Sequence, residues 1–140
     1  MNEFPPDVIL ADAKRPAQVR FSWGDYAFTV TMENPPQVRV SAQVYAEFGK
    51  ELVDFFGLLS RRVKNLPTSQ GMRGGWRVAS NDDELVIEAW CAEKGFMQFS
   101  VSLASDMWDP DWMFRLNISV PESSLPHLAE SVEAFFRYEV

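Results

Sequence analysis

The sequence has one cysteine, one histidine and no long apolar run. Cys91 alone cannot form an intramolecular disulfide, which fits a reducing compartment. His127 alone cannot form a histidine pair for a metal, and a catalytic triad with a histidine base would depend on it. No window approaches about 18 consecutive apolar residues, so we expect no membrane-spanning helix. The first seven residues lack the basic start and apolar stretch of a secretory signal. These absences predict a cytoplasmic protein without a disulfide.

Basic residues are outnumbered by acidic ones, 13 to 20, which gives a formal net charge of −7 and a pI near 4.7. An acidic chain has little general affinity for nucleic acid or for anionic membranes, so we expect neither as a partner. The charge favours solubility first and attraction to a basic protein second.

The chain has enough apolar material for one well-packed domain. Its 140 residues are 46% hydrophobic and 14% aromatic, and neither an internal repeat nor a linker divides them. A chain of this size should bury about 68–70% of the surface that its unfolded form exposes. We therefore expect a single domain over residues 1–140. Residues 1–16, which include three prolines, are predicted to form an irregular N-terminal arm, with Val8 to Leu10 as a possible short edge strand.

Seven segments alternate apolar and polar residues with the period of a β-strand. They begin at Ala17, Tyr26 and Gln37 in the first half, and they span 75–80, 84–92, 96–103 and 112–120 in the second. The last segment is the clearest, with Phe114, Leu116 and Ile118 alternating with polar neighbours. Short polar connections after the fourth and fifth segments predict hairpins and an antiparallel meander.

Two segments have the three-and-four spacing of an amphipathic helix. The first covers about residues 44–66, and acidic residues in its first half and basic residues in its last turns suit the helix dipole. The second covers about residues 124–138. The sequence thus predicts an α+β fold in the order βββαββββα, a mostly antiparallel sheet of about seven strands with two helices packed on one face. A half-closed sheet around the first helix is the alternative.

The loop between the last two predicted strands combines carboxylates with tryptophan. It contains the candidate binding residues Asp106, Trp108, Asp109, Asp111 and Trp112. Three close carboxylates can bind a hard cation, but this loop lacks the glycine and the terminal glutamate of a calcium loop. We therefore predict no metal site and no cofactor. The remaining interpretations are an ordinary hairpin loop and a protein-binding knob with tryptophan anchors.

Arginines are predicted on the polar face of the sheet. By alternation this face should carry the candidate binding residues Arg20, Arg39, Arg77 and Arg115. Arginines can recognise carboxylates or phosphates through two parallel hydrogen bonds, or they can simply pair with Glu88 and keep the face soluble. The second interpretation is favoured, because exposed antiparallel faces are common.

Other catalytic signals are weak. His127 lies near the start of the second helix, where an exposed surface histidine is the simpler interpretation. Cys91 lies near carboxylates, which raise a thiol pKa and favour an inert cysteine. The glycine-rich loop at 71–75 precedes a strand instead of a helix, unlike a phosphate-binding loop.

Between about residues 38 and 136, the chain resembles small uncharacterised bacterial α+β domains of the immunity-protein-like type, some of which occur beside toxins. The resemblance lies in five features of the sequence. They are the predicted helix with Phe55-Phe56, the strand that begins with Gly75-Trp76-Arg77, the run from Leu85 to Trp90, the strand 112–120 and the final Phe135-Phe136 pair. It implies a non-enzymatic, partner-binding domain, and the acidic charge is compatible with a basic toxin as the partner.

Two hypotheses therefore stand. The first is a protein-binding domain that uses the loop at 106–112, the polar sheet face or both, with a homodimer as a further possibility at an exposed edge. The second is a small-molecule binder or enzyme with a pocket between the first helix and the sheet, lined by Tyr45, Trp76 or the candidate binding residue Trp90.

Overall fold

The computed structural model describes residues 5–24, 27–34, 38–62, 76–80, 84–104 and 112–137. The N-terminal sheet has the strand order β1 (Val8–Ala11), β2 (Gln18–Trp23), β3 (Ala27–Asn34) and β4 (Val38–Tyr45). A short 3-10 helix, η1 (Ala46–Phe48), leads from it into α1 (Gly49–Arg62). The C-terminal sheet has the order β5 (Trp76–Ala79), β6 (Leu85–Glu93), β7 (Phe96–Ala104) and β8 (Met113–Pro121). A second 3-10 helix, η3 (Glu122–Ser124), leads into α2 (Leu125–Arg137).

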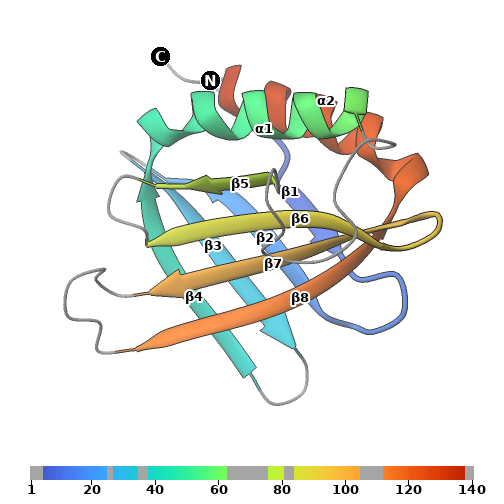
Figure 1. Ribbon diagram of the computed structural model, residues 1–140. Helices are drawn as coiled ribbons and strands as arrows, with labels where there is room; N and C mark the ends of the chain where they lie inside the picture. Colours follow the sequence, from blue (N-terminus) through green and yellow to red (C-terminus); the bar gives the residue numbers. More distant parts are fainter. Residues whose placement is uncertain are drawn as a thin grey trace.

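The two halves of the chain therefore share one topology, an antiparallel meander of four strands followed by a helix (Figure 1). Every strand pair is antiparallel, as the sequence predicted, and the α+β class is confirmed. The predicted order βββαββββα is corrected to ββββαββββα. The additional strand is β1, which pairs with β2 from Val8 to Ala11 at the edge of the sheet. It confirms the short edge strand that the sequence suggested at Val8 to Leu10, within the segment otherwise predicted as an irregular arm.

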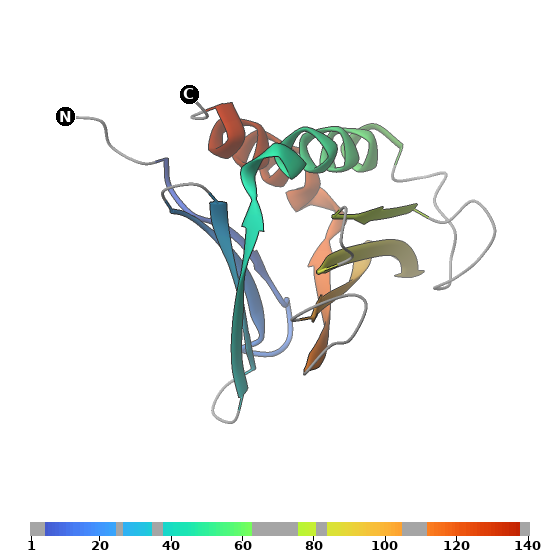
Figure 2. The same ribbon diagram turned by 90° about the vertical axis from the view of Figure 1, so that its left-hand side faces the viewer.

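The prediction of one sheet with both helices on one face is wrong. Figure 2 shows the two sheets facing each other, with α1 and α2 side by side across one end. Buried residues of both sheets and both helices belong to one hydrophobic cluster. The physical reason is that each sheet buries its apolar face partly against the other sheet, so the two helices need not cover either face alone.

The first helix begins later than predicted. The sequence placed its start near Val44, but β4 continues to Tyr45 and α1 begins at Gly49. Val44 keeps the inward alternation of the strand and lies opposite Phe28 of β3. An apolar residue at position 44 fits the period of a strand and also that of a helix. Pairing with β3 makes this segment a strand.

Each helix packs against the sheet of the other half. Phe56 of α1 contacts Phe99 of β7, with ring centroids 5.9 Å apart. Phe136 of α2 packs edge-to-face on Phe28 of β3, at 5.1 Å. This exchange of helices joins the two halves through aromatic contacts, each worth about 0.5–1.5 kcal/mol beyond its buried area.

Trp23 at the end of β2 anchors the last turn of α2. Its ring stacks on Phe135 at a centroid distance of 4.9 Å and an interplanar angle of 12°. Its indole Nε1–H donates to the backbone carbonyl of Phe135 at 2.6 Å. The last carbonyls of a helix have no partner within the helix, so this hydrogen bond satisfies one of them. In the part of the chain that the structure describes, no helix is long and apolar enough to cross a membrane.

Gly49 allows α1 to start against the ring of Phe136. A Cβ atom on Gly49 would lie 2.3 Å from Phe136 Cδ1 and 2.7 Å from its Cγ. Both atoms belong to a ring that is held between Trp23 and Phe28. Only glycine fits at this position without moving that ring.

We predict that Gly49→Ala lowers the free energy of unfolding by about 1–3 kcal/mol, because the added methyl group overpacks the aromatic cluster. The matched control is Gly57→Ala in the same helix, where a Cβ would have only Arg61 Nη1 within 4 Å, at 3.7 Å. That substitution should stabilise the protein by up to about 1 kcal/mol, because glycine is a poor helix former. Urea unfolding of both variants provides the measurement, and equal effects would contradict the packing argument.

Asp12 joins the loop between β1 and β2 to β8 of the other sheet. The side chain of Asp12 is only 3% exposed. Its Oδ2 accepts hydrogen bonds from the backbone N–H groups of Lys14 and Arg15, at 2.9 and 2.8 Å. Its Oδ1 accepts one from Ser119 N–H at 2.7 Å, and Ala13 N–H donates to Ser119 O at 2.8 Å. Together these bonds connect the two sheets along one side.

Burial of Asp12 raises the pKa of its carboxyl, but the N–H groups of Ser119, Lys14 and Arg15 more than offset this, so the pKa lies below 3.8. A depressed folded-state pKa means that the stabilisation is complete well above pH 3.8 and is lost as the pH falls through the folded-state pKa. We therefore predict that Asp12→Ala costs about 2 kcal/mol or more at pH 7. The cost should shrink in acid, as measured by urea unfolding from pH 7 to pH 3. A cost that is independent of pH would show that the carboxylate charge is not responsible.

Candidate interaction surface

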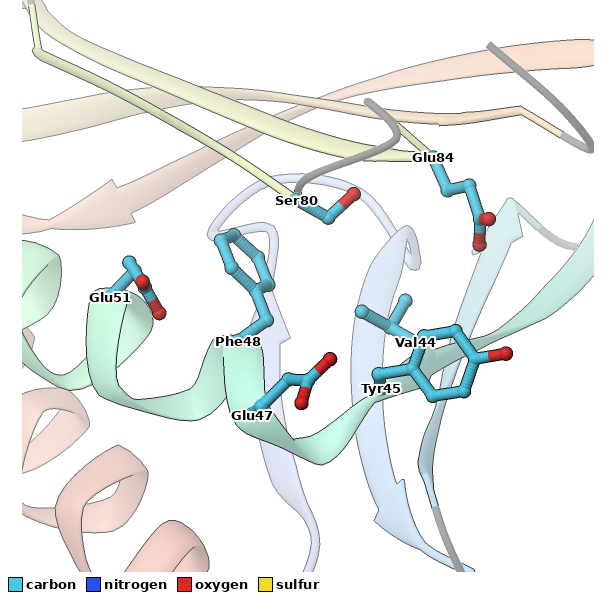
Figure 3. Close-up of a pocket in the computed structure, with 7 residues that line it drawn as sticks. All are labelled: Val44, Tyr45, Glu47, Phe48, Glu51, Ser80 and Glu84. Atoms are coloured by element: carbon cyan, nitrogen blue, oxygen red, sulfur yellow. The ribbon is translucent and has the colours of Figure 1, made fainter.

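A small concave site lies where β4, η1 and the start of α1 meet the turn between β5 and β6. Figure 3 shows the residues that line it, which are Val44, Tyr45, Glu47, Phe48, Glu51, Ser80 and Glu84. Its cavity volume is about 40 Å³. Two of these residues, Val44 and Phe48, belong to the hydrophobic cluster, so the bottom of the site is part of the core.

Backbone hydrogen bonds place Glu84 beside the first helix. Ser80 N–H donates to Leu85 O at 2.9 Å, and Ser80 Oγ accepts from Leu85 N–H at 3.1 Å. These two bonds close the connection between β5 and β6 just before the first ladder pair. Glu84 O in turn accepts from Ala104 N–H of β7 at 2.9 Å. The position of Glu84 is thus determined by the C-terminal sheet, while Glu47 and Glu51 follow β4.

The site combines one exposed aromatic ring with three carboxylates. Tyr45 is 66% exposed, although it is the last residue of β4 and pairs with Ala27 of β3. Figure 3 shows the side chains of Glu47, from η1, and Glu84, from the turn before β6, on two sides of Tyr45. Carboxylates around an exposed ring suit a lysine or arginine side chain, which can form an ion pair and also stack on the ring. Among the described residues, no group of His, Cys, Asp and Glu is arranged to hold a metal ion.

We call Tyr45, Glu47, Glu51 and Glu84 the Tyr45 surface. Met113 of β8 is also 66% exposed, but it lies on a different side of the molecule. Its alternation with the buried Leu116 and Ile118 places it on the outer face of the C-terminal sheet. Tyr45 follows the buried Val44 in β4 and so lies on the outer face of the N-terminal sheet.

Of the predicted acidic loop, the structure describes Trp112, which lies just before β8 and is 37% exposed. The candidate residues Asp106, Trp108, Asp109 and Asp111 lie outside the described residues.

The prediction that four arginines share one polar face is wrong. Arg20 and Arg39 lie on the outer face of the N-terminal sheet, whereas Arg77 and Arg115 lie on the outer face of the C-terminal sheet. The two apolar faces turn toward each other, so the polar faces point in opposite directions (Figure 2). The arginines therefore cannot form one binding site.

Two of these arginines have carboxylate partners and a third has a hydroxyl partner. Arg20 Nη1 lies 3.9 Å from Asp7 Oδ2, and Arg39 Nε lies 3.6 Å from Glu33 Oε1. Arg115 Nε donates to Ser102 Oγ at 3.3 Å. Partly exposed pairs of this kind contribute about 0–1 kcal/mol each.

Trp90 is buried, with 8% of its surface exposed, although its parity places it on the outer face of the C-terminal sheet. The described pockets are lined by neither Trp90 nor Trp76. Of the three residues proposed for a ligand pocket at the first helix, Tyr45 lines the small site described above.

His127 lies in a second groove together with Asp7, Ser124 and Ser131. These are the residue types of a hydrolytic triad, so their geometry matters. Within the described part of the chain, no hydrogen bond connects His127 to any side chain, and the carboxylate of Asp7 faces Arg20. The residues share a groove but are not arranged as a nucleophile, base and acid.

Burial and the carboxylate of Glu122 raise the pKa of the Cys91 thiol above 9.0. The thiol donates to Glu122 Oε1 at 3.9 Å. The sequence predicted this direction from nearby carboxylates, and the carboxylate that contributes is Glu122, which follows β8. A protonated, partly buried thiol is a poor nucleophile.

We predict that iodoacetamide alkylates Cys91 more slowly than free cysteine at pH 8, and that the rate is still increasing at pH 9, because only the thiolate reacts. Glu122→Gln should increase the rate at pH 8 by lowering the thiol pKa. Mass spectrometry over a pH series provides the measurement, and a rate that reaches its plateau below pH 9 would contradict the raised pKa.

No model of a protein family matches the chain, and no curated protein matches it significantly.

Proposed function

We propose that the protein is a non-enzymatic protein-binding domain that binds a basic segment of its partner at the Tyr45 surface. The observation that supports this most directly is the exposed Tyr45 ring beside Glu47 and Glu84, with Glu51 lining the same site (Figure 3). Exposed aromatic residues are common anchors of protein interfaces.

The charge of the whole chain acts in the same direction. With a net charge of −7, the protein attracts basic partners over a distance and accelerates their association. At the Tyr45 surface the negative charge is concentrated, because the carboxylates of Glu47, Glu51 and Glu84 line one small site.

The immunity-type form of this proposal makes the partner a basic toxin encoded beside the gene. Its support is the resemblance to immunity-protein-like domains together with the acidic charge. Binding would inhibit such a toxin by covering basic residues of its active or nucleic-acid-binding surface.

The alternative, a small-molecule site between the first helix and the sheet, has less support. Leu52, Phe56 and Leu59 of α1 are almost completely buried in the shared cluster. The cavity beside Tyr45 has a volume of about 40 Å³, whereas ligand pockets usually measure roughly 300–1,000 Å³.

We predict that replacing Glu47, Glu51 and Glu84 together by glutamine weakens partner binding by at least about tenfold, because it removes the local carboxylates. Tyr45→Ala should have a similar effect without lowering thermal stability, because the ring is largely exposed. Candidate partners are proteins encoded beside the gene and basic proteins recovered from the native host. Titration calorimetry at two salt concentrations measures the affinity.

The matched control removes three other exposed or half-buried acids, through Asp54→Asn, Glu88→Gln and Glu130→Gln. It changes the net charge equally but leaves the Tyr45 surface intact. The control should bind within about threefold of the unmodified protein. Equal loss in both triple variants would show that only total charge matters, and the absence of any stoichiometric partner would refute the proposed function.

A further inference from the structure

The second groove lies beside the free edge of the N-terminal sheet. It has a volume of about 380 Å³ and lies between β1, the end of β8 and α2. The lining residues are Asp7, Ile9, Leu10, Ala11, Val120, Pro121, Ser124, His127, Leu128 and Ser131. The volume is within the usual range of ligand sites.

The backbone of β1 directs hydrogen-bonding groups into this groove. Asp12 N–H donates to Ala17 O, which continues the register of Leu10 with Val19 and Val8 with Phe21. In an antiparallel strand, alternate residues bond to the same neighbour. Val8 and Leu10 therefore bond to β2, whereas Ile9 and Ala11 direct their N–H and C=O groups away from it.

The next residue of the same parity supports this assignment. Ala13 N–H points away from the N-terminal sheet and donates to Ser119 O of β8. Beyond that bond, β1 and β8 are not neighbouring strands of one sheet. Among the described residues, the outward N–H and C=O groups of Ile9 and Ala11 have no strand partner.

We propose that this groove binds an extended segment of a partner protein, which adds to β1 as an antiparallel strand. The outward groups of Ile9 and Ala11 are about 6.8 Å apart along the strand, so three consecutive residues of an extended peptide can satisfy all four. An apolar side chain of the peptide packs on Leu128 and Val120. The groove and the Tyr45 surface have no residue in common, so this proposal does not depend on the proposed function.

We expect the bound peptide to carry a lysine or arginine next to this apolar residue. Asp7 lines the groove, and its ion pair with Arg20 is long, at 3.9 Å, and partly exposed, so its carboxylate can accept another cation. The net charge of −7 favours the same partner.

The shape of the groove favours a single peptide over a second copy of the chain. Residues of α2 form one wall of the groove, beside the free edge of β1. The β1 strand of a second copy carries its own α2, so edge-to-edge pairing would have to accommodate two helices at this place. An isolated extended segment has no such obstacle.

Amide hydrogen exchange of the ¹⁵N-labelled full chain tests the geometry. In the free protein, the amides of Ile9 and Ala11 should exchange at least about tenfold faster than that of Leu10, which bonds to β2. Addition of about 1 mM of a synthetic hexapeptide that alternates valine and lysine should then protect Ile9 and Ala11 at least about tenfold. A valine–glutamate peptide should bind at least about tenfold more weakly.

Ile9→Pro tests the hydrogen bond itself. Proline removes an N–H group that points into the groove and leaves the ladder of Val8 and Leu10 with β2 intact, so the fold should persist. This variant should lose binding of the valine–lysine peptide by at least about tenfold, whereas the control Ile9→Ala, which keeps the N–H group, should stay within about threefold. If thermal unfolding shows that Ile9→Pro is destabilised, Ala11→Pro replaces it, because its N–H group has the same direction.

Three outcomes would overturn the proposal. The first is that the valine–lysine peptide protects neither amide at about 1 mM. The second is that the folded proline variant binds the peptide as well as the unmodified protein does. The third is that Ile9 and Ala11 become protected at high protein concentration without peptide, which would make a second copy the occupant.

Discussion

The contact of Phe135 and Phe136 with the N-terminal sheet is the constraint on which the rest of the molecule depends. Phe135 stacks under Trp23, and Phe136 packs on Phe28 while its ring lies against Gly49. These contacts determine where α2 ends and where α1 begins. The start of α1 determines the position of η1 and thus of Glu47 beside Tyr45. The candidate interaction surface is therefore positioned by the packing of the other helix.

A second connection, at Asp12, has a different physical character. It is polar, and it bridges the two sheets through backbone N–H groups of the loop and of Ser119. It brings the end of β1 against β8, while β1 and β8 do not pair as strands farther along. The groove beside α2 begins where this connection ends. One buried carboxylate thus determines both the closure of the two sheets on this side and the space that remains next to it.

Much of the local structure could be predicted from the sequence, but its assembly could not. The alternation of Leu116 and Ile118 with polar residues identified the inward side of β8 correctly, and the apolar stripe identified α2. The same alternation is compatible with one sheet or with two facing sheets, so the polar faces with Arg20 and Arg115 were wrongly combined. The Tyr45 surface depends on Glu84 meeting a helix from the other half, and no local pattern encodes that contact. The sequence did contain one indication of this surface. Strand alternation carried to Tyr45 would have predicted an exposed aromatic ring close to Glu47.

The exchange of helices has a consequence for how the chain folds. The hydrogen bond from Trp23 to Phe135 joins residues separated by 112 positions, and the aromatic cluster around it cannot form until both halves have been synthesised. Distant residues can meet only after the chain between them has lost conformational entropy. This entropy cost comes before the contact stabilises the fold, so it slows folding. A meander of the first half alone would leave its apolar face exposed to water. Because α2 follows all eight strands, the N-terminal sheet lacks this part of its core until α2 has been synthesised.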